Sequence, residues 1–383
     1  MKTKDLKTKH LLVTGLCAVA LTTGLVACSD DNKDSKSDFE QAAQLDYNAS
    51  NATAWGNYMS VVSGLLKTDA TTLYQTWINS YAAEFKNHNG AYSSALNCVE
   101  TIFDGCMTIA GEVGESKIGE PYNLKVAGKS TEALYAVESW YSWHSRDDYA
   151  NNIRSIRNAF LGSRDGNINA ASLYVVLAAK DKERADHLLA TIEATTQAIL
   201  AIPQPFRNNI SSLEAKAAMD RCADLNEELA SVKGYFQSNI TDDTTLDPVV
   251  SHYVDDVVLP TYKELMEKNS ALDDAVKAFQ QKPSNTGFSA CCNAWLEARE
   301  PWESSEAFLF GPVADLGLDP NMDSWPLDQV GIVGVLNSQD WNSILWNGEY
   351  DEESKDIEGA QNLRGFHTLE YLIFKDGKAR TIN

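Results

Sequence analysis

The segment ADHLLATIEATTQAILAIPQP, residues 185–205, shows most clearly how this chain folds. Its first apolar residues recur at offsets of 0, 3, 4 and 7 positions: Ala185, Leu188, Leu189 and Ile192. This spacing predicts an amphipathic helix, because residues at these offsets share one helical face. Proline lacks a backbone N–H, so Pro203 and Pro205 predict that the helix ends before them.

The regions on either side are also predicted to be helical. A helix with a capped start is expected from Ser130 towards Asn158, and Leu161-Gly162 is a plausible stop after it. Long strand-like alternation is hard to find. Polar breaks fall near 86–90, 114–130, 163–168, 203–211 and 237–247. The last break is the best domain boundary, so the sequence predicts an all-α protein with one helical bundle over 42–240 and a second over 241–383.

The N-terminus has the features of an export signal. Four lysines precede an apolar stretch over 11–26, which is short for a spanning helix, and Leu25-Val26-Ala27-Cys28 resembles the lipobox of bacterial lipoproteins. We expect residues 1–27 to be a signal peptide, Cys28 to be lipidated and residues 28–41 to be a flexible tether. A plain membrane anchor is the alternative. Ser29-Asp30-Asp31 resembles outward sorting signals, which predicts attachment to the outer membrane on its periplasmic or exposed face.

Charge and cysteine content limit the functional classes. The chain carries a formal net charge of −22, and removal of the signal would take away four lysines and one aspartate. Such a surface repels nucleic acid, and it attracts cations. Five cysteines remain in the body without a CxxC pair, so a thiolate zinc site is not expected: Cys98, Cys106, Cys222, Cys291 and Cys292.

The sharpest local signal is GFHTLEYLIF, residues 365–374. His367 and Glu370 are three positions apart, so a helix places them on one face, and both are ligands for divalent transition metals. Gly365 has no side chain and permits close approach of another backbone. The alternative is a His–Glu hydrogen bond inside the core.

A second group follows helical spacing at Trp295, Arg299, Trp302 and Glu306. Its residues are expected along one helical face, turned either towards a shared site or into a tryptophan packing seam. Residues 319–328 are expected to form a compact loop with three carboxylates, whose spacing is not that of an EF-hand. Glu138 and Ser142 are expected on one face of the helix that starts at Ser130, lining a pocket or a domain seam.

These segments together resemble the imelysin-like family. Gly365, His367 and Glu370 match its GxHxxE motif. The run from Trp295 to Pro312 and the run from Asp323 to Pro326 look like two further signatures. Residues 112–121 and 138–142 resemble segments of its other half. Because the GxHxxE half comes last here, the chain resembles a circularly permuted member, which two packed bundles permit.

The resemblance implies two similar four-helix bundles with a site at their interface. The residues expected to line it are Gly365, His367, Glu370, Arg299, Trp302, Glu306, Asp323, Trp325, Glu138 and Ser142. His367, Glu370 and Glu306 are the expected metal ligands. The family carries a metallopeptidase label and is linked to iron uptake.

The chemistry favours binding over catalysis. A zinc peptidase needs about three protein ligands and a general base, and this chain has neither HExxH nor HxxEH. Nitrogen and oxygen ligands suit iron or zinc. We expect a lipoprotein that binds a metal ion, iron favoured, or a small metal-containing ligand for uptake with partner proteins. The alternatives are an HxxE metallopeptidase and a helical interaction scaffold without metal.

Overall fold

A computed structural model describes residues 36–346 and 348–382. The predicted signal peptide and the lipidation site at Cys28 lie outside these residues. Residues 36–41, expected in the flexible tether, instead begin a helix, in which Phe39 contacts the ring of Tyr135. Among the described residues, no helix is both long enough and apolar enough to cross a bilayer.

The described residues are almost entirely helical, as predicted. The α-helices are α1 (Lys36–Gln44), α2 (Ala52–Thr76), α3 (Ala82–Lys86), α4 (Ala95–Glu112), α5 (Gly119–Val126), α6 (Ser130–Tyr135), α7 (Ser145–Leu161), α8 (Leu173–Ala178), α9 (Lys182–Leu200), α10 (Leu213–Asn239), α11 (Asp243–His252), α12 (Leu259–Gln281), α13 (Asn285–Glu303), α14 (Pro312–Asp315), α15 (Leu318–Asp323), α16 (Gln329–Ser338), α17 (Lys355–Gln361) and α18 (Gly365–Ile373). A short antiparallel pair joins β1 (Phe374–Lys375) to β2 (Lys378–Ala379).

Six short elements with other helical periods complete the described part of the chain. The π-helical turns are η1 (Trp77–Tyr81), η2 (Val113–Lys117) and η4 (Tyr253–Val258). The 3₁₀ turns are η3 (Phe206–Asn208), η5 (Glu306–Phe308) and η6 (Trp341–Ile344). Each π-helical turn continues an α-helix, and such turns occur often at functional sites.

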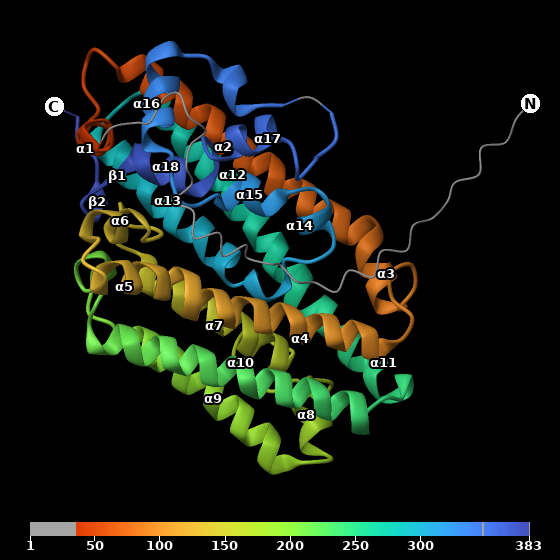
Figure 1. Cartoon of the computed structure of the whole chain (residues 1–383). Coiled ribbons are helices and arrows are strands. Elements are labelled where there is room, and N and C mark those ends of the chain that lie inside the picture. The colour runs from red at the N-terminus through yellow and green to blue at the C-terminus, as the bar shows by residue number, and fades with distance from the viewer. Residues whose placement is uncertain (1–35, 347, 383) are drawn as a thin grey trace, which may run out of the picture.

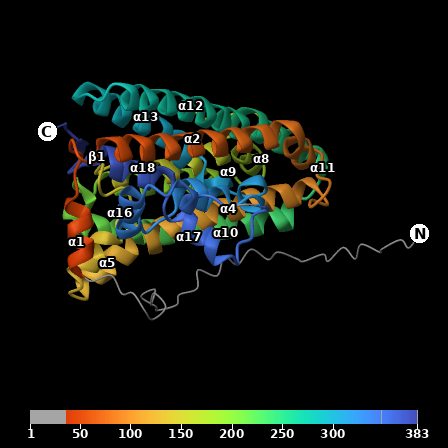
Figure 2. The ribbon, with the colours of Figure 1, turned by 90° about the horizontal axis from the view of Figure 1, so that it is seen from above.

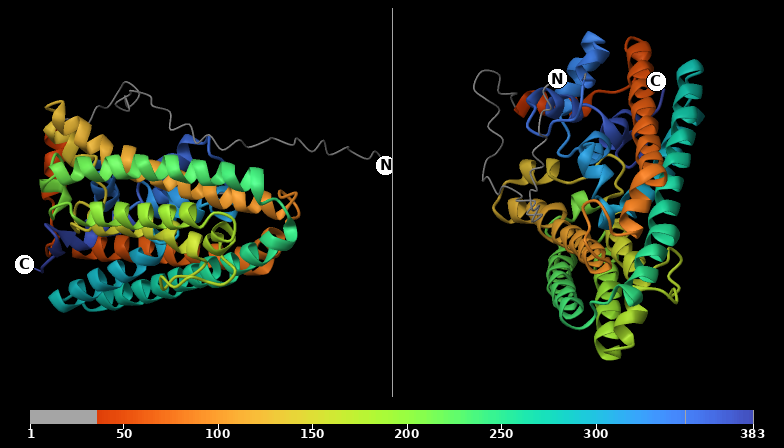
Figure 3. Two further views of the ribbon diagram at one scale, coloured as in Figure 1. Left: turned by 90° about the horizontal axis from the view of Figure 1, so that it is seen from below. Right: turned by 90° about the vertical axis from the view of Figure 1, so that its right-hand side faces the viewer.

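The long helices form two four-helix bundles. In one, α2 packs on α12 and α18, and α13 completes the ring by packing on the same two helices. In the other, α4 and α9 each pack on both α7 and α10. Figure 1 shows the first group above the second, and Figure 3 shows α9 and α10 on the side away from α12 and α13. The two bundles meet where α13 lies against α7.

The helices that make up each bundle are not separated at the predicted boundary between residues 240 and 241. Helix α2 precedes that position in sequence, yet it packs on α12, beside which it runs in Figure 2. The helices of the second bundle are thus inserted between α2 and α12. Helical periodicity indicates which face of a helix is buried, but it does not specify which helix covers that face.

The helix that contains the opening segment forms as expected. Ala185, Leu188 and Ile192 are buried in α9, and Leu189 is half-buried. The Asp181 side chain accepts a hydrogen bond from the backbone N–H of Arg184 and caps the helix start. Burying each large side chain in such a stripe contributes roughly 2 kcal/mol.

The helix predicted from Ser130 to Asn158 is wrong in its middle. Helix α6 ends at Tyr135, and α7 begins at Ser145. The residues between them form a loop in which Ser139 and Trp143 have φ angles of 51° and 64°. Because an α-helix needs negative φ, the chain cannot be helical there. Gly162 ends α7 in the left-handed conformation, as expected.

Candidate metal centre between the two bundles

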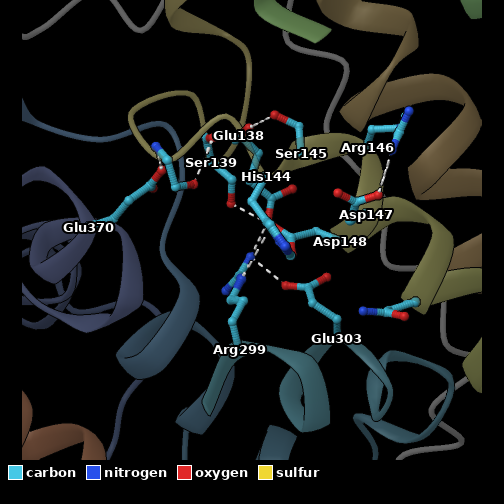
Figure 4. A network of polar contacts seen from close by, with 12 residues as sticks. Glu138, Ser139, His144, Ser145, Arg146, Asp147, Asp148, Arg299, Glu303 and Glu370 are labelled. Carbon is cyan, nitrogen blue, oxygen red and sulfur yellow. Dashed lines mark hydrogen bonds and ion pairs between the residues drawn. The ribbon is translucent and has the colours of Figure 1, made fainter. Parts of the chain in front are cut away.

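The predicted site residues meet at the contact between the bundles. Glu138 and Ser142 come from the α6–α7 loop, Arg299 and Trp302 from α13, and the remaining residues from later segments. The predicted face common to Glu138 and Ser142 is not helical, because both lie in that loop. Figure 4 shows the loop, α7 and α13 converging on this network.

Gly365 sets the position of the HxxE helix. Its φ of 87° is unfavourable for other residues, and an added Cβ would lie 2.5 Å from the carbonyl oxygen of Met322. The start of α18 therefore packs directly on the end of α15, which brings Asp323 to His367. Residues 319–328 were expected to be a loop, but α15 covers them as far as Asp323.

The His367 ring is held on both nitrogens. Its Nδ1 lies 3.0 Å from Oε2 of Glu370, while its Nε2 lies 3.0 Å from Oδ1 of Asp323 and 3.4 Å from Oε1 of Glu138. Trp325 packs edge-on against the ring, with 4.8 Å between ring centres. Glu370 therefore orients the imidazole from behind, and the carboxylates that face Nε2 are Glu138 and Asp323.

The protonation of His367 follows from these neighbours. Burial and the charge of Arg299 oppose its protonation, but the hydrogen bond to Asp323 and the charge of that carboxylate outweigh them. The pKa of His367 is consequently well above its usual value. Carboxylate oxygens on both sides of the ring thus favour its protonated form.

Glu370 also fixes the α6–α7 loop. Its Oε1 accepts a 2.7 Å hydrogen bond from the backbone N–H of Ser142. The Ser142 hydroxyl instead donates to the carbonyl oxygen of Ser139 within the loop. Ser142 thus contributes its backbone to the site, which links α18 of one bundle to the loop that leads into the other.

Arg299 is the centre of charge in the site. Its guanidinium is fully buried and lies 2.6 Å from Glu138 and 2.5 Å from Glu303, and it also contacts Asp323. A fourth carboxylate, Asp148 of α7, lies 3.8 Å from its Nε. Arg299 therefore neutralises acids that come from both bundles.

The two tryptophans of the predicted stripe differ in role. The Trp302 indole N–H donates to Oδ2 of Asp323 at 2.6 Å, while the Trp295 N–H donates to the backbone oxygen of Phe366. Glu306 does not share their helix, because α13 ends at Glu303 and Glu306 begins the 3₁₀ turn η5. The predicted stripe is thus correct only for its first three members.

Lys117 supplies a second, half-buried cation. It ends the π-helical turn η2, and its Nζ lies 3.3 Å from Glu138 and 3.6 Å from Glu306. Burial raises the pKa of Glu138, but the Lys117 charge and the His367 hydrogen bond outweigh it and lower the value to about 2. Glu138 is therefore ionised at any ordinary pH.

Burial disfavours the charged form of several other carboxyl groups in the site. Burial raises the pKa of Glu303 to about 8 despite the charge of Arg299. Burial and the neighbouring charge of Asp323 raise the pKa of Asp319 to about 7. Burial likewise raises the pKa of Glu306 well above its usual value. The site contains more carboxyl groups than its buried cations can compensate.

Within this site, two sets of the described side chains bring metal-ligating atoms within 4.8 Å of one another. One comprises Glu138, Asp323 and His367, and the other comprises Glu303, Glu306 and Asp323. Of the three predicted ligands, only His367 belongs to the first set. Glu370 lies on the opposite side of the ring, and Glu306 belongs to the second set.

Comparison with known proteins defines the family. The model of the family described as Imelysin matches residues 29–232 and 258–383. The chain belongs to the imelysin family. A crystal structure of an imelysin peptidase from Bacteroides ovatus is 56% identical, covers 89% of this chain and 100% of its own, and superposes with a TM-score of 0.87.

Two further relatives carry an iron-related name. Iron-regulated protein A from Synechococcus elongatus is 32% identical over 146 residues, which are 38% of this chain and 35% of that protein. The chain therefore matches about a third of the length of this curated relative. An iron-regulated protein A precursor from Parabacteroides distasonis is 36% identical over 41% of this chain and 47% of its own, with a TM-score of 0.39. The circular permutation stays a prediction.

Sequence reasoning missed several polar residues of this imelysin site. Lys117 appeared only within a family segment, and Asp148 and Glu303 were not predicted to take part. Glu303 lies four positions after Arg299, a helical spacing that favours an ion pair and could have revealed it. Asp148 pairs with His144 at 2.7 Å and accepts from Ser139 at 2.6 Å, contacts that depend on the unpredicted loop.

Proposed function

We propose that this imelysin binds a divalent metal ion, iron favoured, through Glu138, Asp323 and His367, and that it does so for metal uptake. The observation that carries the proposal is the gathering of these three donor atoms within 4.8 Å at the contact of the two bundles. One imidazole nitrogen and two carboxylate oxygens form a ligand set that suits iron or zinc. The ion alone or a small metal-containing ligand fits this chemistry.

Binding requires the residues of the site to exchange partners. His367 must lose its proton from Nε2, and Arg299 must release Glu138 and Asp323. Glu303 would then lose its proton and compensate Arg299 together with Asp148, because both carboxyl groups already face its guanidinium. A bound divalent ion would supply the positive charge that the ionised ligands then need.

Glu370 has a positioning role in this proposal. Its contact with Nδ1 selects the tautomer of His367 that leaves Nε2 free to bind the ion. Such a partner behind a ligating histidine typically contributes roughly 10- to 100-fold to metal affinity.

The choice of iron and the cellular setting rest on sequence relationships. The name of the Synechococcus relative supports an iron-related role. The family match begins at residue 29, directly after Cys28, which supports the proposal that a lipid on Cys28 tethers the body to the outer membrane. Partner proteins of an iron-uptake system would then receive the metal.

Anaerobic titration of the purified protein with Fe²⁺, followed by metal analysis, tests the binding proposal. Asp323→Asn and His367→Ala should each remove one bound equivalent of iron. His252→Ala, at an exposed histidine outside the ligand set, should leave the iron content unchanged. Circular dichroism checks that each variant is folded. Unchanged iron binding in a folded Asp323→Asn protein would refute the proposed ligand set.

The geometry gives less support to peptidase activity. His367, Glu370 and Arg299 are fully buried, and a polypeptide substrate would need an open path to them. The Nδ1 side of His367 is taken by Glu370, and the described part of the site provides no second histidine at Nε2. Metal-dependent cleavage of casein that Glu370→Gln abolishes would reverse this judgement.

A further inference from the structure

We propose a second metal site at the far end of the helices, formed by His88, Asp243 and Asp247. One ligand atom from each of these residues lies within 4.8 Å of the others. His88 follows α3, and the two aspartates lie on α11, which packs on α3 at the right-hand end of the molecule in Figure 1. The expected ligand is a divalent transition-metal ion such as Zn²⁺.

The two aspartates are presented together by helical geometry. Asp243 and Asp247 are four positions apart in the first turns of α11, so their side chains share one face. Oδ1 of Asp243 accepts a 3.0 Å hydrogen bond from the backbone N–H of Ala95, the first residue of α4. This contact holds the Asp243 carboxylate against the start of α4.

The imidazole reaches these aspartates from a separate segment. His88 adopts a φ of 36° in the turn after α3, where its backbone N–H donates to the carbonyl oxygen of Phe85. Its Nε2 lies 3.1 Å from Oδ1 of Asp247. The turn thus places a histidine beside residues that lie more than 150 positions later in the chain.

The chemistry of the neighbours defines the ligand set. Cys98 is fully buried, and its Sγ donates a 3.2 Å hydrogen bond to the carbonyl oxygen of Phe85. The atoms that lie close enough to share an ion are one imidazole nitrogen and two carboxylate oxygens. Ca²⁺ and Mg²⁺ prefer oxygen ligands alone, whereas an imidazole favours zinc or ferrous iron.

Access distinguishes this site from the proposed centre between the bundles. The side chains of His88 and Asp247 are 25% and 48% exposed, so water can complete the coordination. Among the contacts of the described residues, no lysine or arginine bridges the carboxylates of Asp243 and Asp247. In the central site, by contrast, Arg299 is paired with the carboxylates. A metal ion could therefore bind here without displacing a buried cation.

The chain contains a matched control. His252 and Asp256 form another exposed pair, with 2.6 Å between Nδ1 and Oδ2. This pair has no third carboxylate, histidine or cysteine close enough to form a group within the described chain. A His–Asp hydrogen bond is thus common to both places, and only the His88 group adds a third ligand.

Equilibrium dialysis of the full-length protein against buffered ZnCl₂ tests the second site. We expect His88→Ala and Asp247→Asn each to lose one zinc equivalent that His252→Ala retains. Asp323→Asn should also retain it, which separates failure here from failure of the proposed central site. Zinc-edge anomalous diffraction should place a peak beside Nε2 of His88.

Two results would overturn the second site. One is a zinc content in His88→Ala equal to that of the unaltered protein. The other is an equal loss of zinc in His88→Ala and His252→Ala, which would mean that zinc binds only as a weak partner of any exposed histidine.

Discussion

Arg299 carries a full positive charge in a place without solvent, and carboxylates surround it. Removing a buried charge leaves its partners uncompensated, and that loss costs about 3–5 kcal/mol. We expect Arg299→Leu to lower the free energy of unfolding by about this amount in urea titrations. Arg184→Leu, at a half-buried surface pair, should cost at most about 1 kcal/mol. Equal losses in the two variants would contradict the central role of Arg299.

The raised pKa of Glu303 predicts how stability changes with pH. Its folded-state pKa of about 8 lies above the roughly 4.3 expected in the unfolded chain. The contribution of a group with a raised pKa is complete below the unfolded value and is lost as pH rises through the folded value. Stability should thus fall between about pH 5 and pH 9, with a slope from this group of at most about 1.4 kcal/mol per pH unit.

Glu303→Gln should flatten that decline, because a glutamine cannot ionise. Urea unfolding measured across the same pH range gives the comparison. Glu300→Gln, at an exposed residue of the same helix, should leave the slope unchanged. A Glu303→Gln protein with the slope of the unaltered protein would show that Glu303 is already ionised at low pH.

At the scale of elements, the α15–α18 junction depends on one glycine. Gly365→Ala would place a Cβ against the carbonyl of Met322 at a positive φ, which we expect to cost about 1–3 kcal/mol. Since this junction aligns Asp323 with His367, metal affinity should fall too. Gly359→Ala, inside α17 with open space around it, should instead be neutral or stabilise by up to about 1 kcal/mol. Thermal unfolding and Fe²⁺ titration measure both effects, and equal behaviour of the variants would contradict this account.

The α6–α7 loop acts through its backbone. Ser142→Ala keeps the N–H that donates to Glu370, so metal affinity should change less than about twofold. Glu370→Gln puts an amide beside Nδ1 of His367 and should weaken binding by roughly 10- to 100-fold. Isothermal titration of both variants is the measurement. A larger effect from Ser142→Ala would place the functional group on the serine hydroxyl.

Helices and helix ends could be predicted where neighbouring residues alone determine them. The stripe of α9 and the stop at Gly162 follow from periodicity and glycine conformation. The break between α6 and α7 was missed, because residues with positive φ there are a serine and a tryptophan, which rarely adopt that conformation. The ligands Glu138 and Asp323 were expected near the site, but their approach to Nε2 depends on that loop and on α15.

At the scale of the molecule, the site exists because two bundles face each other. Periodicity indicates which face of each helix is buried, but it does not state which helices are neighbours. The pairing of α2 with α12 and α18 and the contact of α7 with α13 were consequently beyond a single sequence. The family resemblance supplied what periodicity could not, namely a site at the interface of the two bundles.

The position of the centre has a consequence for stability. Its ligands come from the loop before α7 and from segments packed in the other bundle, so a bound ion would hold both together. An ion that binds only the folded state stabilises it by mass action, by about 2.7 kcal/mol at a concentration 100-fold above Kd.

Anomalous diffraction at the iron edge, from crystals grown anaerobically with Fe²⁺, tests the central claim most directly. We expect an iron peak within bonding distance of Nε2 of His367 and of the carboxylates of Glu138 and Asp323, with Arg299 turned away from both carboxylates. The proposed metal centre would be contradicted if the map showed no iron peak beside His367 and Arg299 still bridged Glu138 and Asp323.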